Sequence, residues 1–384
     1  MSTQPREPHW HDNQLPASTP DDGAPPVRIP WQQEPVNLQG NYGQAPDAGA
    51  LHLNSQSAYS AHRPPHSYPG MDAHPPVPAR QPVTRVLGYH RLSHADPNTR
   101  WWSPLVEGLI GLGVFAGLTF IITLPLLAAM FVDPYYANVL TAPDPMKSMT
   151  DAAFENPWMF AYLFGSIAIM FPALWVARLC MGPKPWGLVH SVAGRMRWGW
   201  LLICAGIAAV VFVLLPMIIN AVLGAGEAPL LRQPPQHLWI FIVLLLTLVP
   251  VQCYAEELVF RGYLMQTIGR WLKHPAFAII LPAPLFMIGH TYDLWGQASV
   301  LCMGVAAGFL AWRTGGLESG IALHAVNNII AMFGGLMGTG DPFVQQGSTF
   351  ADFAVVFAIE LIYVLAVLWV AKRRKIQRTR EETY

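Results

Sequence analysis

Long apolar runs separated by short polar connections fill the chain from Trp101 onward. There are eight such runs, and most of them approach the roughly 20 residues needed to cross a hydrocarbon layer of about 30 Å. Backbone polar groups in lipid must be satisfied within the segment, so these runs predict helices. The expected fold class is therefore an all-α integral membrane protein, a polytopic bundle of about eight transmembrane helices. The predicted spans are residues 105–132, 157–180, 199–223, 238–270, 275–292, 297–312, 318–337 and 350–371.

The first hundred residues show neither helical nor strand periodicity. They hold 17 of the 35 prolines and 8 of the 13 histidines of the chain. Such a segment buries too little apolar surface to offset its loss of conformational entropy, so we expect it to be disordered. The predicted organisation is a Pro/His-rich cytoplasmic tail over residues 1–100, a transmembrane helical domain over 101–371 and a basic cytoplasmic C-terminus over 372–384. We expect the tail to be a solvated spacer.

Composition agrees with this pattern and removes several other classes of protein. Hydrophobic residues make up 53% of the chain and charged residues 12%, against about 25% charged residues in average soluble proteins. The formal net charge of +0 argues against nucleic acid as a partner, because nucleic-acid binding depends on a cationic surface. Four cysteines are too few for a secreted disulfide scaffold.

Basic residues fall on alternate connections between the runs. Most Arg and Lys residues precede the first run, follow the last or lie in the even-numbered connections, whereas the odd-numbered connections contain only Lys147 and Arg232 as bases. The positive-inside rule then places both termini in the cytoplasm, which requires an even number of crossings. We therefore expect a multi-pass integral protein of a bacterial cell membrane.

Ionisable side chains inside apolar spans are energetically costly and are functional candidates by default. The densest group is Glu256, Glu257 and Arg261, directly after the apolar run 244–251. On a helix, Glu257 and Arg261 are four residues apart and can form an ion pair, which we interpret as structural. Glu256 is rotated by about 100° and has no expected partner nearby in sequence. A lone carboxylate in a poorly solvated cavity can act as a general base, and this is our interpretation of Glu256.

Two further polar positions join these candidates. The polar turn around Lys273 lies 17 residues from both Glu256 and His290, so an antiparallel hairpin would bring both side chains to the same depth, about 24 Å from the turn. His324 and Asn328 are four residues apart and share one face of their helix. They could donate hydrogen bonds to an oxyanion, and His324 could alternatively bind a metal.

Three motifs on successive apolar helices, taken in this order, resemble those of the CPBP family. This family comprises the CAAX-processing and bacteriocin-immunity intramembrane proteases, also called Abi proteins. The resemblance covers roughly residues 200–340 and implies an intramembrane endopeptidase of about eight helices, with the active site among the middle spans. The motifs are Glu256-Glu257-x-x-x-Arg261, Phe286-x-x-x-His290 and His324-x-x-x-Asn328.

The resemblance also implies a role for each of these residues. Glu256 and His290 would activate a water molecule that attacks the scissile carbonyl. The tetrahedral oxyanion would be stabilised by His324 and Asn328. Three residues would support this arrangement, with the first two ordering the first motif and the third packing nearby: Glu257, Arg261 and Phe286.

The expected reaction needs no cofactor, because a glutamate-activated water requires no metal ion. A zinc site formed by Glu256, His290 and His324 stays open as an alternative, with a fourth position for water. The expected substrate is a membrane-associated protein or peptide, and the expected environment is the lipid bilayer. The sequence favours no particular oligomeric state.

Two other classes of function compete with the protease. The same residues could serve structurally in a non-enzymatic membrane protein, an immunity or partner-binding factor. Intramembrane Glu and His residues also build the relays of proton- or ion-coupled transporters. The sequence shows no inverted repeat of broken spans, which makes the transporter the weakest of the three hypotheses.

Overall fold

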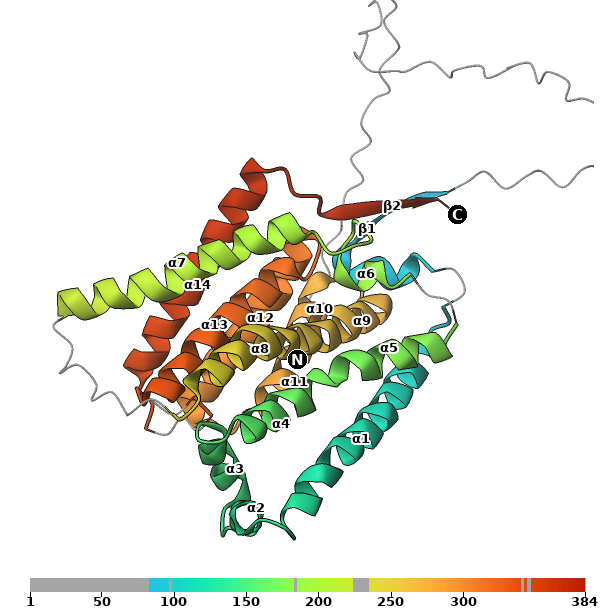
Figure 1. Cartoon of the computed structure of the whole chain (residues 1–384). Coiled ribbons are helices and arrows are strands. Elements are labelled where there is room, and N and C mark those ends of the chain that lie inside the picture. Colours follow the sequence, from blue (N-terminus) through green and yellow to red (C-terminus); the bar gives the residue numbers. More distant parts are fainter. Residues whose placement is uncertain are drawn as a thin grey trace, which may run out of the picture. The chain divides into compact units, whose positions relative to one another are not determined.

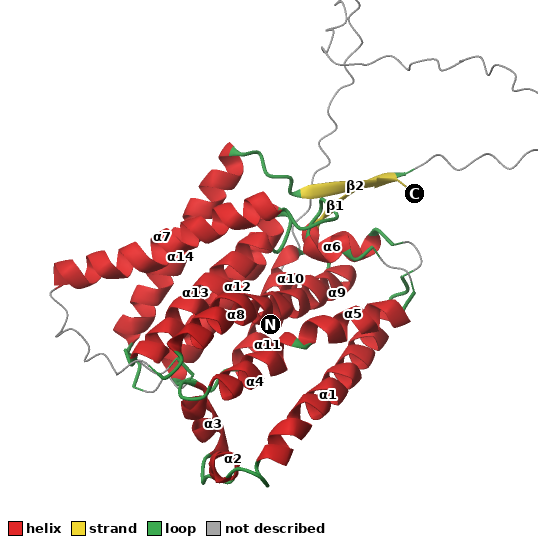
Figure 2. Cartoon of the chain, viewed as in Figure 1, coloured by secondary structure: helices red, strands yellow, loops and turns green. Residues whose placement is uncertain are grey.

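The computed structural model describes residues 83–96, 99–182, 185–223, 235–339, 342–343 and 347–383. Most of the predicted disordered tail, residues 1–82, lies outside the described residues. Helices make up most of the described chain (Figures 1 and 2). The elements are β1 (Thr84–Gly88), the 3₁₀ helix η1 (Tyr89–His94), α1 (Ser103–Ala129), α2 (Pro134–Leu140), α3 (Pro145–Ala153), α4 (Pro157–Ala168), α5 (Met170–Cys180), α6 (Gly187–His190), α7 (Trp198–Leu223), α8 (Leu238–Glu257), the π-helix η2 (Leu258–Leu264), α9 (Met265–Trp271), α10 (Pro275–Ile280), α11 (Pro282–Ile288), α12 (Leu294–Thr314), α13 (Glu318–Met337), α14 (Phe350–Arg373) and β2 (Thr379–Thr383).

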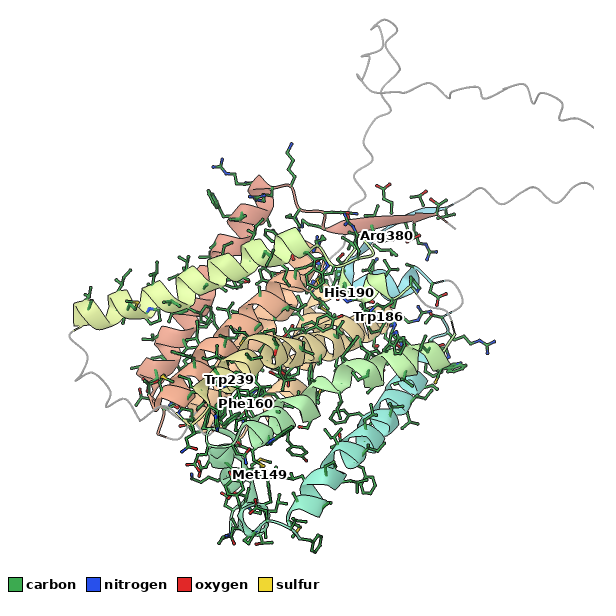
Figure 3. All side chains as sticks on the ribbon, viewed as in Figure 1. Met149, Phe160, Trp186, His190, Trp239 and Arg380 are labelled. Atoms are coloured by element: carbon green, nitrogen blue, oxygen red, sulfur yellow. The ribbon has the colours of Figure 1, made fainter. Side chains whose placement is uncertain are left out.

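The predicted all-α membrane fold is confirmed. Seven helical segments of the described chain are long and apolar enough to cross a membrane. Two of these segments are composite: α4 and α5 follow one another over Pro157–Cys180, and α8, η2 and α9 form one 34-residue segment over Leu238–Trp271. Apolar side chains on α1 and α7 point away from the bundle (Figure 3), as expected of surfaces in contact with lipid.

One predicted span departs from the expectation. The run 275–292 is not one continuous helix, because α10 and α11 together end at Ile288. Their 14 residues would extend only about 21 Å as a helix, less than the hydrocarbon thickness. Pro282, at the first position of α11, lacks a backbone N–H and interrupts the helical ladder there.

The N-terminal boundary of the folded region also differs from the prediction. Residues 83–96 lie within the segment 1–100 that was expected to be disordered, yet they form β1 and η1. β1 pairs with β2 in an antiparallel sheet, and the Tyr89 side chain is fully buried. Side chains of η1 then cap the end of α9: Arg91 donates to the Gly269 carbonyl at 2.8 Å and Ser93 to the Gln266 carbonyl at 3.0 Å.

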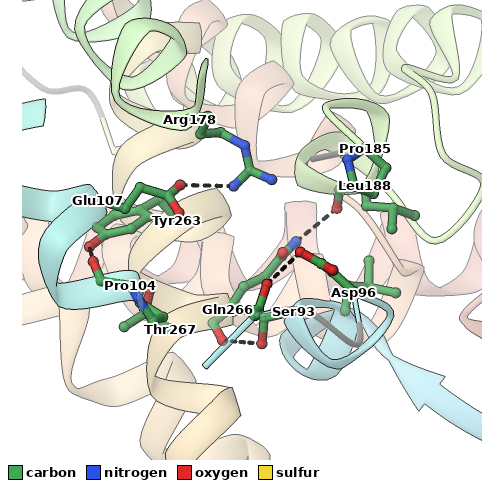
Figure 4. A pocket seen from close by; sticks show the side chains of 12 residues that line it. Ser93, Asp96, Pro104, Glu107, Arg178, Pro185, Leu188, Tyr263, Gln266 and Thr267 are labelled. Carbon is green, nitrogen blue, oxygen red and sulfur yellow. Dashed lines mark hydrogen bonds and ion pairs between the residues drawn. The ribbon is translucent and has the colours of Figure 1, made fainter. Parts of the chain in front are cut away.

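Ion pairs and small residues fix the helices relative to one another. Arg197, just before α7, forms two short hydrogen bonds of 2.7 and 2.6 Å with the buried Glu318 carboxylate at the start of α13. Arg178 on α5 pairs with Glu107 on α1 at 3.0 Å (Figure 4). On α12, a Cβ at Gly308 would lie 3.3 Å from the Ile279 side chain, so this glycine permits close packing against α10.

Candidate active site

The two glutamates of the first motif lie where helix geometry changes. Glu256 and Glu257 end α8, and the chain continues without a break into the π-helix η2, which contains Arg261. π-Helical turns inside α-helices are rare and often mark functional sites, because they alter which side chains share a face. Both glutamates are buried, with 8% and 1% of their surface exposed.

The predicted ion pair between Glu257 and Arg261 is present. Arg261 Nη1 donates to Glu257 Oε1 at 2.7 Å, and both side chains are almost fully buried. The guanidinium also lies 4.2 Å from the centre of the Phe286 ring, in cation–π geometry. Two glycines make room for the pair: a Cβ at Gly320 would lie 3.0 Å from Glu257 Oε2, and one at Gly304 would lie 3.2 Å from Arg261 Nη2.

His324 lies between the two glutamates. Its Nδ1 is 3.1 Å from Glu257 Oε1, and its Nε2 is 3.4 Å from Glu256 Oε2. The side chain is 1% exposed. The seventh predicted span, now α13, therefore brings its histidine to the end of α8. The imidazole connects the carboxylate interpreted as structural with the carboxylate interpreted as a general base.

The expectation that Glu256 has no local partner is wrong. Gln252, one helical turn earlier, donates from Nε2 to Glu256 Oε2 at 2.7 Å. The i, i+4 spacing of these two residues was visible in the sequence. The sequence prediction considered only the charged residues that follow Glu256. Gln252, a buried amide directly after the apolar run 244–251, was not among the candidates.

His290 and Asn328 lie at the edge of this cluster. His290, in the turn after α11, is half-buried, and its Nδ1 is 3.1 Å from the Phe286 carbonyl. The Phe286 ring contacts both imidazoles, with centroids 5.1 Å from His290 and 5.5 Å from His324. Asn328 lies one turn beyond His324 and accepts a hydrogen bond from Asn327 at 3.2 Å.

The structure thus brings the predicted residues together to different degrees. Five of them form a continuous set of contacts, namely Glu256, Glu257, Arg261, Phe286 and His324. His290 joins this set through the Phe286 ring, and Asn328 lies on the same helix as His324. Within the described ranges, neither His290 nor Asn328 forms a hydrogen bond with Glu256.

The residues proposed as zinc ligands do not fit a metal ion as they are placed. Over the described part of the chain, no group of three or more His, Cys, Asp or Glu side chains is arranged to hold one. Both nitrogens of His324 already face glutamate oxygens.

A separate polar cavity lies beside the N-terminal segment. It measures about 40 Å³ and is lined by residues of η1, α1, α5 and α9, including the Glu107–Arg178 pair (Figure 4). Gln266 crosses it to donate to the Leu188 carbonyl at 2.8 Å. None of the candidate catalytic residues lines this cavity, so it is not the site that the motifs predict.

Histidines outside the spans take part in packing. Trp186, directly before α6, lies beside His190 at the end of that helix (Figure 3), and His190 Nε2 is 2.7 Å from the Tyr254 hydroxyl on α8. Burial lowers the pKa of His190. This contact ties the connection before α7 to the helix that carries the two glutamates.

Comparison with known proteins agrees with the motifs. Residues 235–330 match the family model described as "Type II CAAX prenyl endopeptidase Rce1-like". The "Uncharacterized protein YyaK" of Bacillus subtilis (strain 168) is 24% identical over 256 residues, which cover 62% of this chain and 84% of that protein. No solved structure matches the chain.

The matched range contains all the candidate residues between Glu256 and Asn328. With seven membrane-length helices around it, the match indicates an integral membrane protease of the CAAX type. The resemblance predicted from the three motifs is confirmed, because the match of residues 235–330 to the Rce1-like family model fits the CPBP family.

Proposed function

We propose that the protein is an intramembrane endopeptidase that hydrolyses a peptide bond of a membrane-associated protein or peptide with a water activated by Glu256. The observation that carries this proposal is the placement of Glu256, a buried carboxylate whose Oε2 is held by Gln252 and faces His324. In the described structure its Oε1 accepts no hydrogen bond. A carboxylate oxygen left free in a buried site can take a proton from water.

In this proposal the other residues divide the remaining work. His290 assists Glu256 in activating the water, and its position on the same Phe286 ring as His324 supports this role. As the hydroxide adds to the carbonyl carbon, the oxygen gains charge and is stabilised by the side-chain amide of Asn328 and by His324 Nε2, which forms no hydrogen bond in the described structure. Protonated Glu256 then returns its proton to the leaving amine, and the C–N bond breaks.

Glu257 and Arg261 act by holding His324 rather than by touching substrate. Glu257 Oε1 lies 2.7 Å from Arg261 and 3.1 Å from His324 Nδ1. An imidazole fixed at Nδ1 presents its Nε2 edge in one direction, toward Glu256. The family description suggests a substrate class, a prenylated peptide with a C-terminal CAAX sequence.

The direct test is Glu256→Gln, which keeps the size and the hydrogen-bonding capacity of the side chain but removes the base. Purified protein in lipid vesicles is assayed with a farnesylated CAAX peptide that carries a fluorophore and a quencher, with and without EDTA. We expect Glu256→Gln to lower kcat at least about 1,000-fold, and EDTA to leave wild-type cleavage unchanged.

The matched control is Glu360→Gln, the same substitution at another buried glutamate on α14. Glu360 contacts none of the candidate residues in the described structure, so its variant should cleave at the wild-type rate. Retained cleavage by a folded Glu256→Gln variant would overturn the proposal. Loss of cleavage in EDTA that only zinc restores would replace the metal-free mechanism.

A further inference from the structure

Gln252 is an amide buried in the middle of an apolar helix. It follows the run 244–251 on α8 and is 3% exposed. Burying an amide away from water is unfavourable unless its hydrogen bonds are made, and inside a membrane span water cannot replace them. Packing alone would be better served by an apolar side chain of the same length.

The two ends of the amide are both occupied. Nε2 donates to Glu256 Oε2 at 2.7 Å, and Oε1 accepts from Cys253 Sγ at 3.4 Å. Since His324 Nε2 also lies 3.4 Å from Glu256 Oε2, one carboxylate oxygen faces two nitrogens. The other oxygen, Oε1, accepts no hydrogen bond from any described residue.

We infer that Gln252 is a positioning residue that fixes the carboxylate of Glu256, so that Oε1 is the oxygen presented to water. This inference rests on the proposed function. The amide donates to Oε2 both before and after Oε1 takes the proton, so it keeps the carboxylate plane in place through the reaction. Gln252 touches neither water nor substrate in this role.

The test replaces the amide with an apolar side chain of similar length. Gln252→Met should lower kcat on the farnesylated CAAX peptide about 10- to 100-fold, by analogy with the loss seen when a hydrogen-bond partner that orients a metal ligand is removed. KM should stay within about twofold of the wild-type value, because Gln252 contacts no substrate. Thermal unfolding in detergent shows whether the variant is folded.

The matched control is Gln266→Met on α9. Gln266 is also a buried glutamine that donates one hydrogen bond, but its acceptor is the Leu188 carbonyl. A general effect of losing a buried amide would lower activity in both variants equally. We expect Gln266→Met to keep the wild-type kcat, whatever it does to stability.

A second variant separates hydrogen bonding from packing. In Gln252→Glu, two carboxyl groups face each other, and with one shared proton the new side chain can still donate to Oε2. Its cleavage should exceed that of Gln252→Met in the pH range where the pair holds one proton, giving a pH–rate profile unlike that of the wild type.

The outcomes distinguish this inference from the proposed function. An unchanged kcat in Gln252→Met, together with an inactive Glu256→Gln, would overturn the positioning role and leave the protease mechanism intact. Equal losses at every pH in Gln252→Met and Gln252→Glu would also overturn it. Retained activity in Glu256→Gln would instead remove the proposed function itself.

Discussion

At the scale of single residues, the candidate site is a chain of contacts rather than a pair of facing groups. Arg261, Glu257, His324 and Glu256 touch in this order, and Gln252 closes the far end. Because these side chains are buried, each charged group depends on its neighbour for compensation. Removing a charged member of such a series leaves the charge of its neighbour without compensation.

Arg261→Met tests this dependence. The substitution leaves the Glu257 carboxylate buried without its cation, which should lower the free energy of unfolding by about 3–5 kcal/mol. The double variant Glu257→Gln/Arg261→Met removes both charges and should recover part of that loss. Thermal unfolding of the purified proteins in detergent measures both effects. The buried-pair interpretation would be contradicted if the double variant lost as much free energy of unfolding as Arg261→Met and Glu257→Gln lose together.

One ion pair of this site could be predicted from residue spacing alone. The i, i+4 rule identified the Glu257–Arg261 pair correctly. The contact between Glu256 and His324 was not predicted, because it depends on how α13 packs against α8, and hydropathy does not encode which helix faces which. The same limit applies to Gln252, whose value as a partner appears only when Glu256 points toward it.

At the scale of elements, the N-terminal segment caps the helix that carries the site. The last carbonyls of α9 have no helical partners, and Arg91 of η1 donates to that of Gly269, while Ser93 donates to the Gln266 carbonyl nearer the start of the helix. The backbones of η1 and α9 lie close together, because a Cβ added at Gly269 would overlap with the His90 carbonyl oxygen. The sequence did not predict that this short segment folds against the bundle, because it directly follows a long proline-rich stretch and was assigned to the same disordered tail.

The attachment of η1 should weaken in acid. Burial, helped by repulsion from Arg91 and Arg270, lowers the pKa of His94 to about 4, and burial also lowers the pKa of His90. In a detached segment, the His94 imidazole would have a pKa near 6.5. The stabilisation from neutral His94 is therefore complete above about pH 6.5 and is lost progressively as the pH falls toward 4.

Hydrogen exchange measures this effect. After correction for the intrinsic pH dependence of exchange, amides of residues 89–94 should be less protected at pH 5 than at pH 7.5, with those of α13 unchanged. His94→Gln cannot gain a charge, so it should reduce the difference. Equal protection at both pH values in the wild type would contradict the role assigned to His94.

At the scale of the whole folded region, a few contacts show where the two chain ends, the end of α9 and the start of α12 lie. β1 and β2 pair with each other, so the segments before the first span and after the last lie together. The end of α9 bonds to the N-terminal side, where Trp271 donates to the Trp101 carbonyl at 2.8 Å. The start of α12 lies instead beside α14, with Trp295 and Phe350 ring centroids 5.2 Å apart.

The short pair α10–α11 must therefore carry the chain from one end of the bundle to the other. The hydropathy pattern predicted one continuous membrane span here, whereas the structure has two short helices over Pro275–Ile288, fewer residues than a membrane-crossing helix needs. Prolines at positions 282 and 284 explain why the run is broken, since each lacks the backbone N–H of a helical turn. The even number of traverses that the basic residues require is compatible with this path.

A disulfide across the strand pair tests the placement of the two ends. Val86 and Glu381 are direct partners in the register, and both are exposed. Facing residues of antiparallel strands have Cα atoms about 4.5–5.5 Å apart, within the range that a disulfide spans. In a background without the four native cysteines, Val86→Cys/Glu381→Cys should therefore cross-link under mild oxidation in native membranes.

The control moves one cysteine by a single residue. Val86→Cys/Glu382→Cys places the second thiol on the opposite face of the sheet, because successive strand side chains alternate, and it should cross-link far less. A gel-mobility shift reversed by reductant reports the bond in both variants. Equal cross-linking in both would indicate flexible ends rather than a registered sheet. If neither variant cross-linked, the two strands would not be paired, and the structural support for an even number of crossings would be lost.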